Sequence, residues 1–147
     1  MRGIELLHPD VRKQAEQLVV EAAKEGLPVL ITETFRSRSE QDKLYAQGRT
    51  TPGKQVTWVQ YPNSAHNWGV AFDFCRNARG KEYDDDDGFF ARVGAIAKRI
   101  GLFWGGDFRI SKDKPHCESP LYFPGNCAET LIAKYGTPEE FKKTWAA

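Results

Sequence analysis

The sequence has no long apolar run, and its first residues lack the pattern of a leader. None of the apolar stretches in its 147 residues approaches the roughly 20 residues that a membrane-spanning helix needs. The N-terminal stretch, MRGIELLHPDVRKQAEQLVV, contains neither an apolar core segment nor a small-residue cleavage site, so we expect no signal peptide. The protein is therefore expected to be made in the cytoplasm and to have no membrane partner.

An excess of either charge is also missing. Lysine and arginine total 21 against 20 aspartates and glutamates, which leaves a formal net charge of +1. A nucleic-acid binder usually carries a basic stripe, so we expect no nucleic-acid partner. The balance leaves open a polymer substrate that is held by specific contacts.

Cysteine is scarce and shows no metal-binding spacing. The three cysteines, Cys75, Cys117 and Cys127, form no C-x-x-C pair, which argues against a structural zinc knuckle. Their odd number and the expected cytoplasmic synthesis favour reduced thiols, with a Cys117–Cys127 disulfide as the alternative. The length and an apolar share of 40% are those of one soluble domain with a single core.

Repeats, low-complexity segments and linkers are absent as well, so residues 1–147 are predicted to form one domain. Apolar residues recur at helical spacing after Pro9 until Gly26. Ser37 and Glu40 have the spacing of a capping box ahead of a second helix. The predicted helices cover about 9–26, 39–47, 84–101 and 128–135, with a last one from Thr137.

Short β-prone stretches separate these helices. Strands are predicted at 28–32, at 70–75, in LFW (102–104) and around His116. Residues 48–65 are rich in Gly, Pro, Thr and Asn and predict a long loop of the kind that is usually functional or disordered, with a short strand expected at VTWV, 56–59. This mixed order predicts an α+β fold, with helices packed around a small antiparallel sheet.

The acidic run 84–87 invites a calcium-loop interpretation, which fails. An EF-hand with Gly88 at its sixth position would need an acid at Tyr83 and a glutamate at Gly94. We therefore interpret the run as acids at the start of the third helix, where the helix dipole favours them.

Asp73 is a carboxylate inside the predicted strand VAFDF, between two phenylalanines. Burying it is costly unless a cation, hydrogen-bond donors or a metal compensates its charge. Taken alone, a salt bridge or a bond to a loop backbone is the simpler interpretation. His66 precedes it by seven residues, in a loop or at a strand edge.

A third residue, His116, changes that interpretation. Two histidines and one carboxylate are the ligand set of a catalytic zinc site with a position open for water, and Asp113 could take a proton from that water. The iron triad of oxygenases uses the same ligand types, but it usually has one residue between the first histidine and the carboxylate, whereas six lie between His66 and Asp73. The remaining histidine, His8, is expected to be a surface residue near a helix cap with no partner.

Three motifs now resemble a known family. SAHNWGVAFD (64–73) fits S-x-H-x-x-G-x-A-x-D, and KDKPH (112–116) fits a D-x-P-H element that follows W-G-G-D, here 104–107. TETFRSRSEQDKLYAQGRT (32–50) fits a Y/F-R-S…Q…L-Y-x-x-G-R-T segment. Together they resemble the zinc-dependent D-Ala-D-Ala carboxypeptidase and L-alanyl-D-glutamate endopeptidase family of phage endolysins and wall-remodelling enzymes. The match covers about 32–118, and we expect 121–147 to be a helical packing extension.

The resemblance implies roles for individual residues. One Zn²⁺ ion would be held by His66, Asp73 and His116, and a single anionic ligand would leave the doubly charged ion net positive. Asp113 would act as general base and then general acid, and Arg36 would stabilise the oxyanion or grip the substrate. Supporting or substrate contacts are expected from Ser64, Gln41, Asp107 and Trp68, although Trp68 and Trp104 fit core packing equally well. Cys117 and Phe108 depart from the usual residues, and we expect both to touch the pocket wall.

The implied fold is the hedgehog/D-Ala-D-Ala peptidase type, and the implied partner is a peptidoglycan stem peptide. The leading hypothesis is an endolysin-type endopeptidase that cuts L-Ala–D-Glu and acts on the cell wall after release from the cytoplasm. A D-Ala-D-Ala carboxypeptidase or dipeptidase on the same scaffold is the first alternative. A non-catalytic module that keeps a zinc site is the second.

Overall fold

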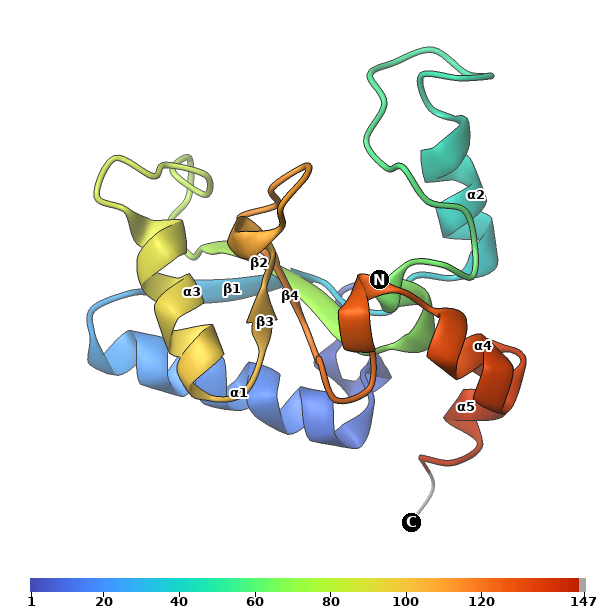
Figure 1. The fold of residues 1–147 in the computed structure, drawn as a ribbon. Helices are drawn as coiled ribbons and strands as arrows, with labels where there is room; N and C mark the ends of the chain where they lie inside the picture. The colour runs from blue at the N-terminus through green and yellow to red at the C-terminus, as the bar shows by residue number, and fades with distance from the viewer. Residues whose placement is uncertain (146–147) are drawn as a thin grey trace.

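The computed structural model describes residues 1–145 and has the predicted α+β architecture (Figure 1). Four antiparallel strands form one sheet in the order β1-β2-β4-β3. Their bounds are Val29–Glu33 for β1, Ala71–Arg76 for β2, Phe103–Trp104 for β3 and His116–Glu118 for β4. All four predicted main strands are present, but 56–59 is irregular, so the short strand expected in the long loop was wrong.

Five helices surround this sheet within the described residues. They are α1 (Pro9–Lys24), α2 (Arg38–Ala46), α3 (Phe89–Arg99), α4 (Glu129–Tyr135) and α5 (Pro138–Lys142). The Ser37–Glu40 capping box of α2 is confirmed, since both of its hydrogen bonds form. In Figure 1, α1 runs below the sheet, whereas α2 and the loop after it rise above it. Among residues 1–145, no helix is both long and apolar enough to cross a membrane.

The acidic run before α3 has the predicted helix-start role. The carboxylates of Asp85 and Asp87 accept hydrogen bonds from the backbone N–H groups of Phe90 and Phe89, at 3.0 and 3.1 Å. These donors have no partner inside the helix.

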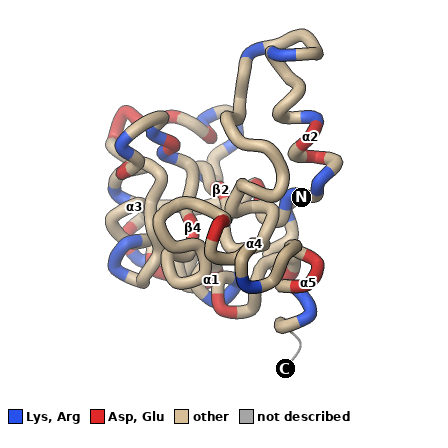
Figure 2. Tube along the Cα trace, turned by 45° about the vertical axis from the view of Figure 1, so that its right-hand side comes forward, with Lys and Arg blue, Asp and Glu red and all other residues tan. Residues whose placement is uncertain are grey.

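Figure 2 shows basic and acidic segments interspersed over the described chain.

The core fills the space between α1, α3 and one face of the sheet. Phe72 and Phe74 of β2 are fully buried on that face, and the Phe74 ring lies 5.5 Å from that of Phe90 at the start of α3. Because successive strand residues point to opposite faces, Asp73 between them must emerge on the other side of the sheet. The strand that forms the core thus also directs one carboxylate away from it.

The C-terminal helices fold back onto the start of α1. Phe141 of α5 packs on Trp68 at 5.9 Å and on His8 at 5.7 Å between ring centroids. His8 is also the N-cap of α1, since its Nδ1 accepts a hydrogen bond from Asp10 N at 3.1 Å. The expectation that His8 has no partner was therefore wrong, because its aromatic neighbours come from the other end of the chain.

Trp104 of β3 joins α3 to the turn before β4. An added Cβ at Gly94 would lie 2.3 Å from the indole, and one at Gly106 would lie 2.2 Å from it. Both glycines therefore let the backbone lie against the ring. The indole Nε1 donates to Lys114 O at 2.7 Å, so the ring also holds the turn that contains Asp113.

Because of this packing, we expect Gly94→Ala to lower the free energy of unfolding, although the same substitution usually stabilises a helix. Alanine normally stabilises a helix interior by about 1 kcal/mol relative to glycine, but here its methyl group must displace Trp104, and overpacking of this kind costs about 1–3 kcal/mol. We expect a lower free energy of unfolding in urea. Ala95→Gly, at an exposed position of the same helix, is the control and should cost about 1 kcal/mol. A stabilised Gly94→Ala protein would contradict the packing argument.

Candidate metal centre

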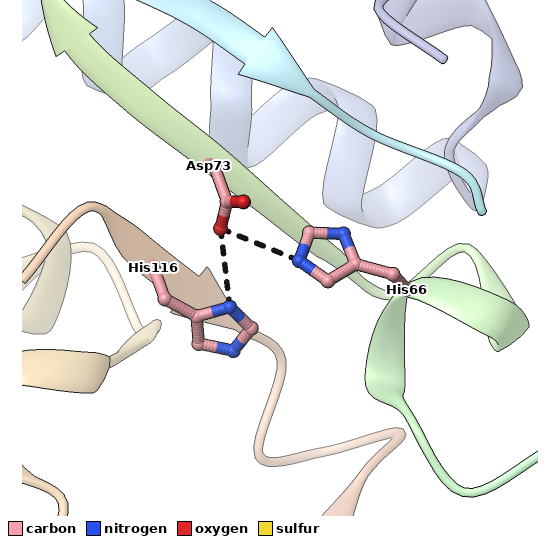
Figure 3. A group of neighbouring side chains, drawn as sticks. All are labelled: His66, Asp73 and His116. Atoms are coloured by element: carbon pink, nitrogen blue, oxygen red, sulfur yellow. Dashed lines mark hydrogen bonds and ion pairs between the residues drawn. The ribbon is translucent and has the colours of Figure 1, made fainter. Parts of the chain in front are cut away.

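Strand pairing brings together two of the predicted ligands. In the antiparallel register of β2 with β4, Asp73 lies directly opposite His116, and side chains of such pairs share one face of the sheet. The Asp73 Oδ1 atom lies 3.3 Å from His116 Nδ1 (Figure 3). The two residues are 43 positions apart in sequence, so only the sheet can set this distance.

A short 3-10 turn, Ala65–Trp68, delivers the third ligand. Ser64 caps it by accepting a hydrogen bond from His66 N at 3.3 Å, and the Asn67 side chain bonds back to Ser64 N at 3.1 Å. Gly69, at a φ of 68°, ends the turn immediately before β2. His66 is thereby buried with its Nε2 3.3 Å from Asp73 Oδ1.

The three side chains form a group that could hold a metal ion. One ligand atom from each of His66, Asp73 and His116 lies within 4.8 Å of the others. His66 Nδ1 lies 2.8 Å from the Thr34 carbonyl and His116 Nε2 lies 2.7 Å from Glu118 Oε1. Because both partners can only accept, those two nitrogens carry protons, and the nitrogens facing Asp73 are the ones that could give their lone pairs to a metal. This donor set fits a divalent metal of the zinc type.

The electrostatics of the group favour positive charge between the rings. Burial acts to raise the pKa of Asp73, but the charge of His66 and hydrogen bonds to both histidines hold that pKa well below its ordinary value. Burial acts to lower the pKa of His116, but hydrogen bonds to Asp73 and Glu118 outweigh it and raise the pKa to about 10. A site that stabilises a proton in this way also offers its charge to a metal cation.

Asp113 opens onto the same cavity from the turn before β4. Its backbone N–H donates to Gly105 O at 2.9 Å, and His116 N donates to Asp113 O at 3.1 Å. An added Cβ at Gly105 would lie 2.2 Å from Asp113 O and 2.8 Å from His116 Cβ, so this turn needs glycine at that position. Asp113 is an exposed residue, but neighbouring protein atoms partly desolvate its carboxylate. This desolvation raises its pKa above the ordinary aspartate value.

Arg36 is held beside the group by its backbone and its side chain. Its N–H donates to His66 O at 3.0 Å, and its guanidinium contacts Glu33 Oε1 at 3.4 Å and Gln41 Oε1 at 3.2 Å. Gln41 is fully buried and also donates to Val59 O at 2.8 Å. Gln41 therefore ties Arg36 to the long loop and does not itself line the cavity.

The three residues of the metal group, His66, Asp73 and His116, line a cavity of about 240 Å³. Its lining comprises Arg36, Leu44, Val56, Thr57, Ser64, His66, Asp73, Asp113 and His116. A second hollow of about 290 Å³ shares Val56, Thr57, Ser64, Asp113 and His116 with it and continues to Phe108 and Asn126. Six of the predicted site residues, including Ser64, therefore meet in one cleft.

Trp68 is buried in the core, one of the two expected alternatives, and its Nε1–H donates to Pro62 O at 2.6 Å, so it supports the turn that holds His66. The expectation that Cys117 touches the pocket wall was wrong. Cys117 points into the core, because it alternates with His116 along β4. Asp107 lies outside the residues that line either hollow and pairs with Lys98 at 3.0 Å. Phe108 does line the wall, with its ring 5.5 Å from that of His116.

Sequence reasoning missed Glu118. It is buried, and its carboxylate is the partner of His116. The signal was present in HCE, since residues two apart on a strand share a face. Cys75, Cys117 and Cys127 are all free in the structure.

Comparisons with known proteins agree with this geometry. A family model described as VanY, D-alanyl-D-alanine carboxypeptidase, matches residues 4–114. The chain is 43% identical over 121 residues to the peptidoglycan L-alanyl-D-glutamate endopeptidase CwlK of Bacillus subtilis (strain 168), which covers 76% of this chain and 72% of CwlK. It is 29% identical over 123 residues to the L-alanyl-D-glutamate peptidase of Listeria phage A118, which covers 80% of this chain and 40% of that protein.

Solved structures show the same fold at low sequence identity. The Serratia marcescens L-Ala D-Glu endopeptidase ChiX aligns with a TM-score of 0.56 at 21% identity, covering 83% of this chain and 87% of ChiX. The vancomycin-resistance D,D-pentapeptidase VanY, crystallised as its E175A mutant with Zn(II), aligns with a TM-score of 0.59 at 18% identity, covering 92% and 83%. The motifs, the fold and the family match agree, and the chain belongs to the VanY D-alanyl-D-alanine carboxypeptidase family.

Proposed function

We propose that this protein is a zinc peptidase that hydrolyses the L-Ala–D-Glu bond of peptidoglycan stem peptides. The observation that carries the proposal is the convergence of His66, Asp73 and His116 in a cleft that Asp113 and Arg36 also line. A resident metal with two histidines and one carboxylate as ligands supplies Lewis-acid activation of water and of the scissile carbonyl. The substrate bond follows the names of the relatives CwlK and ChiX.

The protein side chains have separable tasks in this reaction. Asp113 accepts a proton from the attacking water and returns it to the leaving amine, a role that a raised pKa suits because the carboxyl is then a better base. Arg36 is held by Glu33 and Gln41 before substrate arrives. Its charge is therefore placed in advance for the developing oxyanion or for a carboxylate of the substrate.

The shape of the cleft favours an endopeptidase over a carboxypeptidase. The cleft runs past the metal group to Asn126, and a further apolar hollow of about 570 Å³ beside α4 shares Val59, Asn63 and Asn126 with it. A chain could therefore continue beyond the cut bond. A carboxypeptidase needs a cation for the free carboxylate, and among the described residues lining these three hollows Arg36 is the one arginine or lysine.

The proposal includes a site of action. The substrate is part of the bacterial cell wall, so the enzyme acts there, after release from the cytoplasm in which it is made. The family description keeps the D-Ala-D-Ala carboxypeptidase activity as the second candidate.

Incubation with purified sacculi separates these activities. We expect mass spectrometry of the digested material to find new N-terminal D-Glu or D-isoGln ends, because the bond before that residue is cut. Release of D-Ala would instead identify the carboxypeptidase. Zinc binding with neither product would leave the metal in a non-catalytic module and overturn the proposal.

Asp113→Asn should separate metal binding from catalysis. We expect normal zinc content by metal analysis and a loss of hydrolysis of about 100-fold or more, since a positioned general base contributes that much. The raised pKa of Asp113 also makes the free energy of unfolding depend on pH. Ionised Asp113 is disfavoured in the fold, so wild type loses stability as pH rises from the unfolded-state pKa through the raised folded-state pKa.

The same variant should therefore be as stable as wild type at low pH and more stable at neutral pH, in urea unfolding with EDTA present. A variant that is less stable than wild type at neutral pH would show that the Asp113 carboxylate has a structural role.

His116→Ala should lose metal and activity together, because it removes one of three ligand atoms. The measurement is zinc content after dialysis, with Asp113→Asn as the control that stays loaded. Full zinc occupancy in the alanine variant would disprove the ligand assignment.

A further inference from the structure

Glu118 is a buried anion with a single partner. It is 2% exposed, and its Oε1 lies 2.7 Å from His116 Nε2. Its other oxygen, Oε2, is buried and has no hydrogen-bond partner among residues 1–145. Its cross-strand neighbours are Ala71 and Phe103, whose side chains cannot donate. Because a buried carboxylate is costly without compensation, its contact with His116 must explain its presence.

The contact determines which nitrogen of His116 faces Asp73. Glu118 and His116 lie two residues apart on β4, so their side chains share the face that carries the metal group. The carboxylate accepts the Nε2–H, so Nδ1, which lies 3.3 Å from Asp73 Oδ1, is the nitrogen whose lone pair would be available to a metal. His66 has the opposite arrangement, with its Nδ1–H on the Thr34 carbonyl and its Nε2 toward Asp73.

We propose that Glu118 is a positioning residue, which holds the His116 ring and its tautomer so that Nδ1 is the metal-binding atom. This inference rests on the proposed function, since it assumes that the group binds a metal. Partners of this kind orient ligating histidines and increase their basicity. His116 and His66 then differ in basicity as well as in geometry, because the partner of His116 is a carboxylate and the partner of His66 is a neutral carbonyl.

Two other roles for Glu118 fit the structure less well. A direct ligand would have to approach the metal group, but Glu118 Oε1 lies against Nε2, the nitrogen of His116 that faces away from Asp73. A packing role would be served by an apolar side chain without the cost of a buried charge. Neither role accounts for the 2.7 Å contact.

Glu118→Gln and Glu118→Leu test the proposal through metal affinity. The glutamine keeps the size but can present an NH₂ group to the ring, which permits the wrong tautomer, and the leucine removes the acceptor. We expect the dissociation constant for zinc ion, measured by chelator competition, to rise about 10–100-fold in both. The absorption spectrum of the Co²⁺-loaded protein should change as well, because the ring is no longer held.

Ser119→Ala is the matched control, since Ser119 is buried on the same segment and contacts Tyr122 N. It should leave zinc affinity within twofold of wild type. Urea unfolding in EDTA shows whether each variant folds. Folded Glu118 variants with wild-type zinc affinity would overturn the positioning role, whereas wild-type protein that binds no zinc would overturn the proposed function instead.

A measurement on the wild type keeps the proposal testable if both variants fail to fold. In long-range ¹H–¹⁵N spectra of the zinc-loaded protein, we expect His116 to carry its proton on Nε2 and His66 on Nδ1. A His116 ring that is protonated on Nδ1 would contradict the assignment.

Discussion

The antiparallel pairing of β2 with β4 is the constraint on which the site depends. It places Asp73 opposite His116 and Phe72 opposite Cys117, so the metal group and the core are built on the two faces of the same strand pair. A shift of the register by one residue would exchange these faces. The aromatic packing of Phe72 and Phe74 against the helices therefore also fixes the ligands.

Glu118 adds a second carboxylate to the charges around the metal group. With Asp73 as the single anion, a doubly charged ion would remain net positive and could stabilise an oxyanion alone. A second carboxylate behind His116 offsets the remaining charge, although it acts through the ring and not directly on the metal. Under the proposed function, Arg36, which is held by Glu33 and Gln41, would be the positive charge that faces the substrate and would stabilise more of the developing negative charge.

Short patterns in the sequence predicted local features, and the family resemblance predicted the ligands, but the partners of His8 and the role of Glu118 were missed. The α+β class, the capping box at Ser37 and the position of Asp73 in a strand follow from short patterns, and the structure agrees. The partners of His8 come from α5 and its surroundings, so no local pattern could reveal them. Alternation along β4 determines which of its residues face the core. Three residues are too few, however, for the sequence alone to predict which face of the strand is buried.

The W-G-G-D segment illustrates why a motif need not act through its charged residue. Asp107 bonds to Lys98 at the surface, whereas the three residues before it shape the site. The Trp104 indole donates a hydrogen bond to Lys114 O. The missing Cβ atom of Gly106 leaves space for the Trp104 ring, and that of Gly105 leaves space for the turn that contains Asp113. A side chain at Gly105 would push on both Asp113 and His116, the proposed base and a proposed ligand. The approach of the Asp113 turn to His116 thus depends on the absence of a Cβ atom at Gly105, which no inventory of chemically active residues would identify.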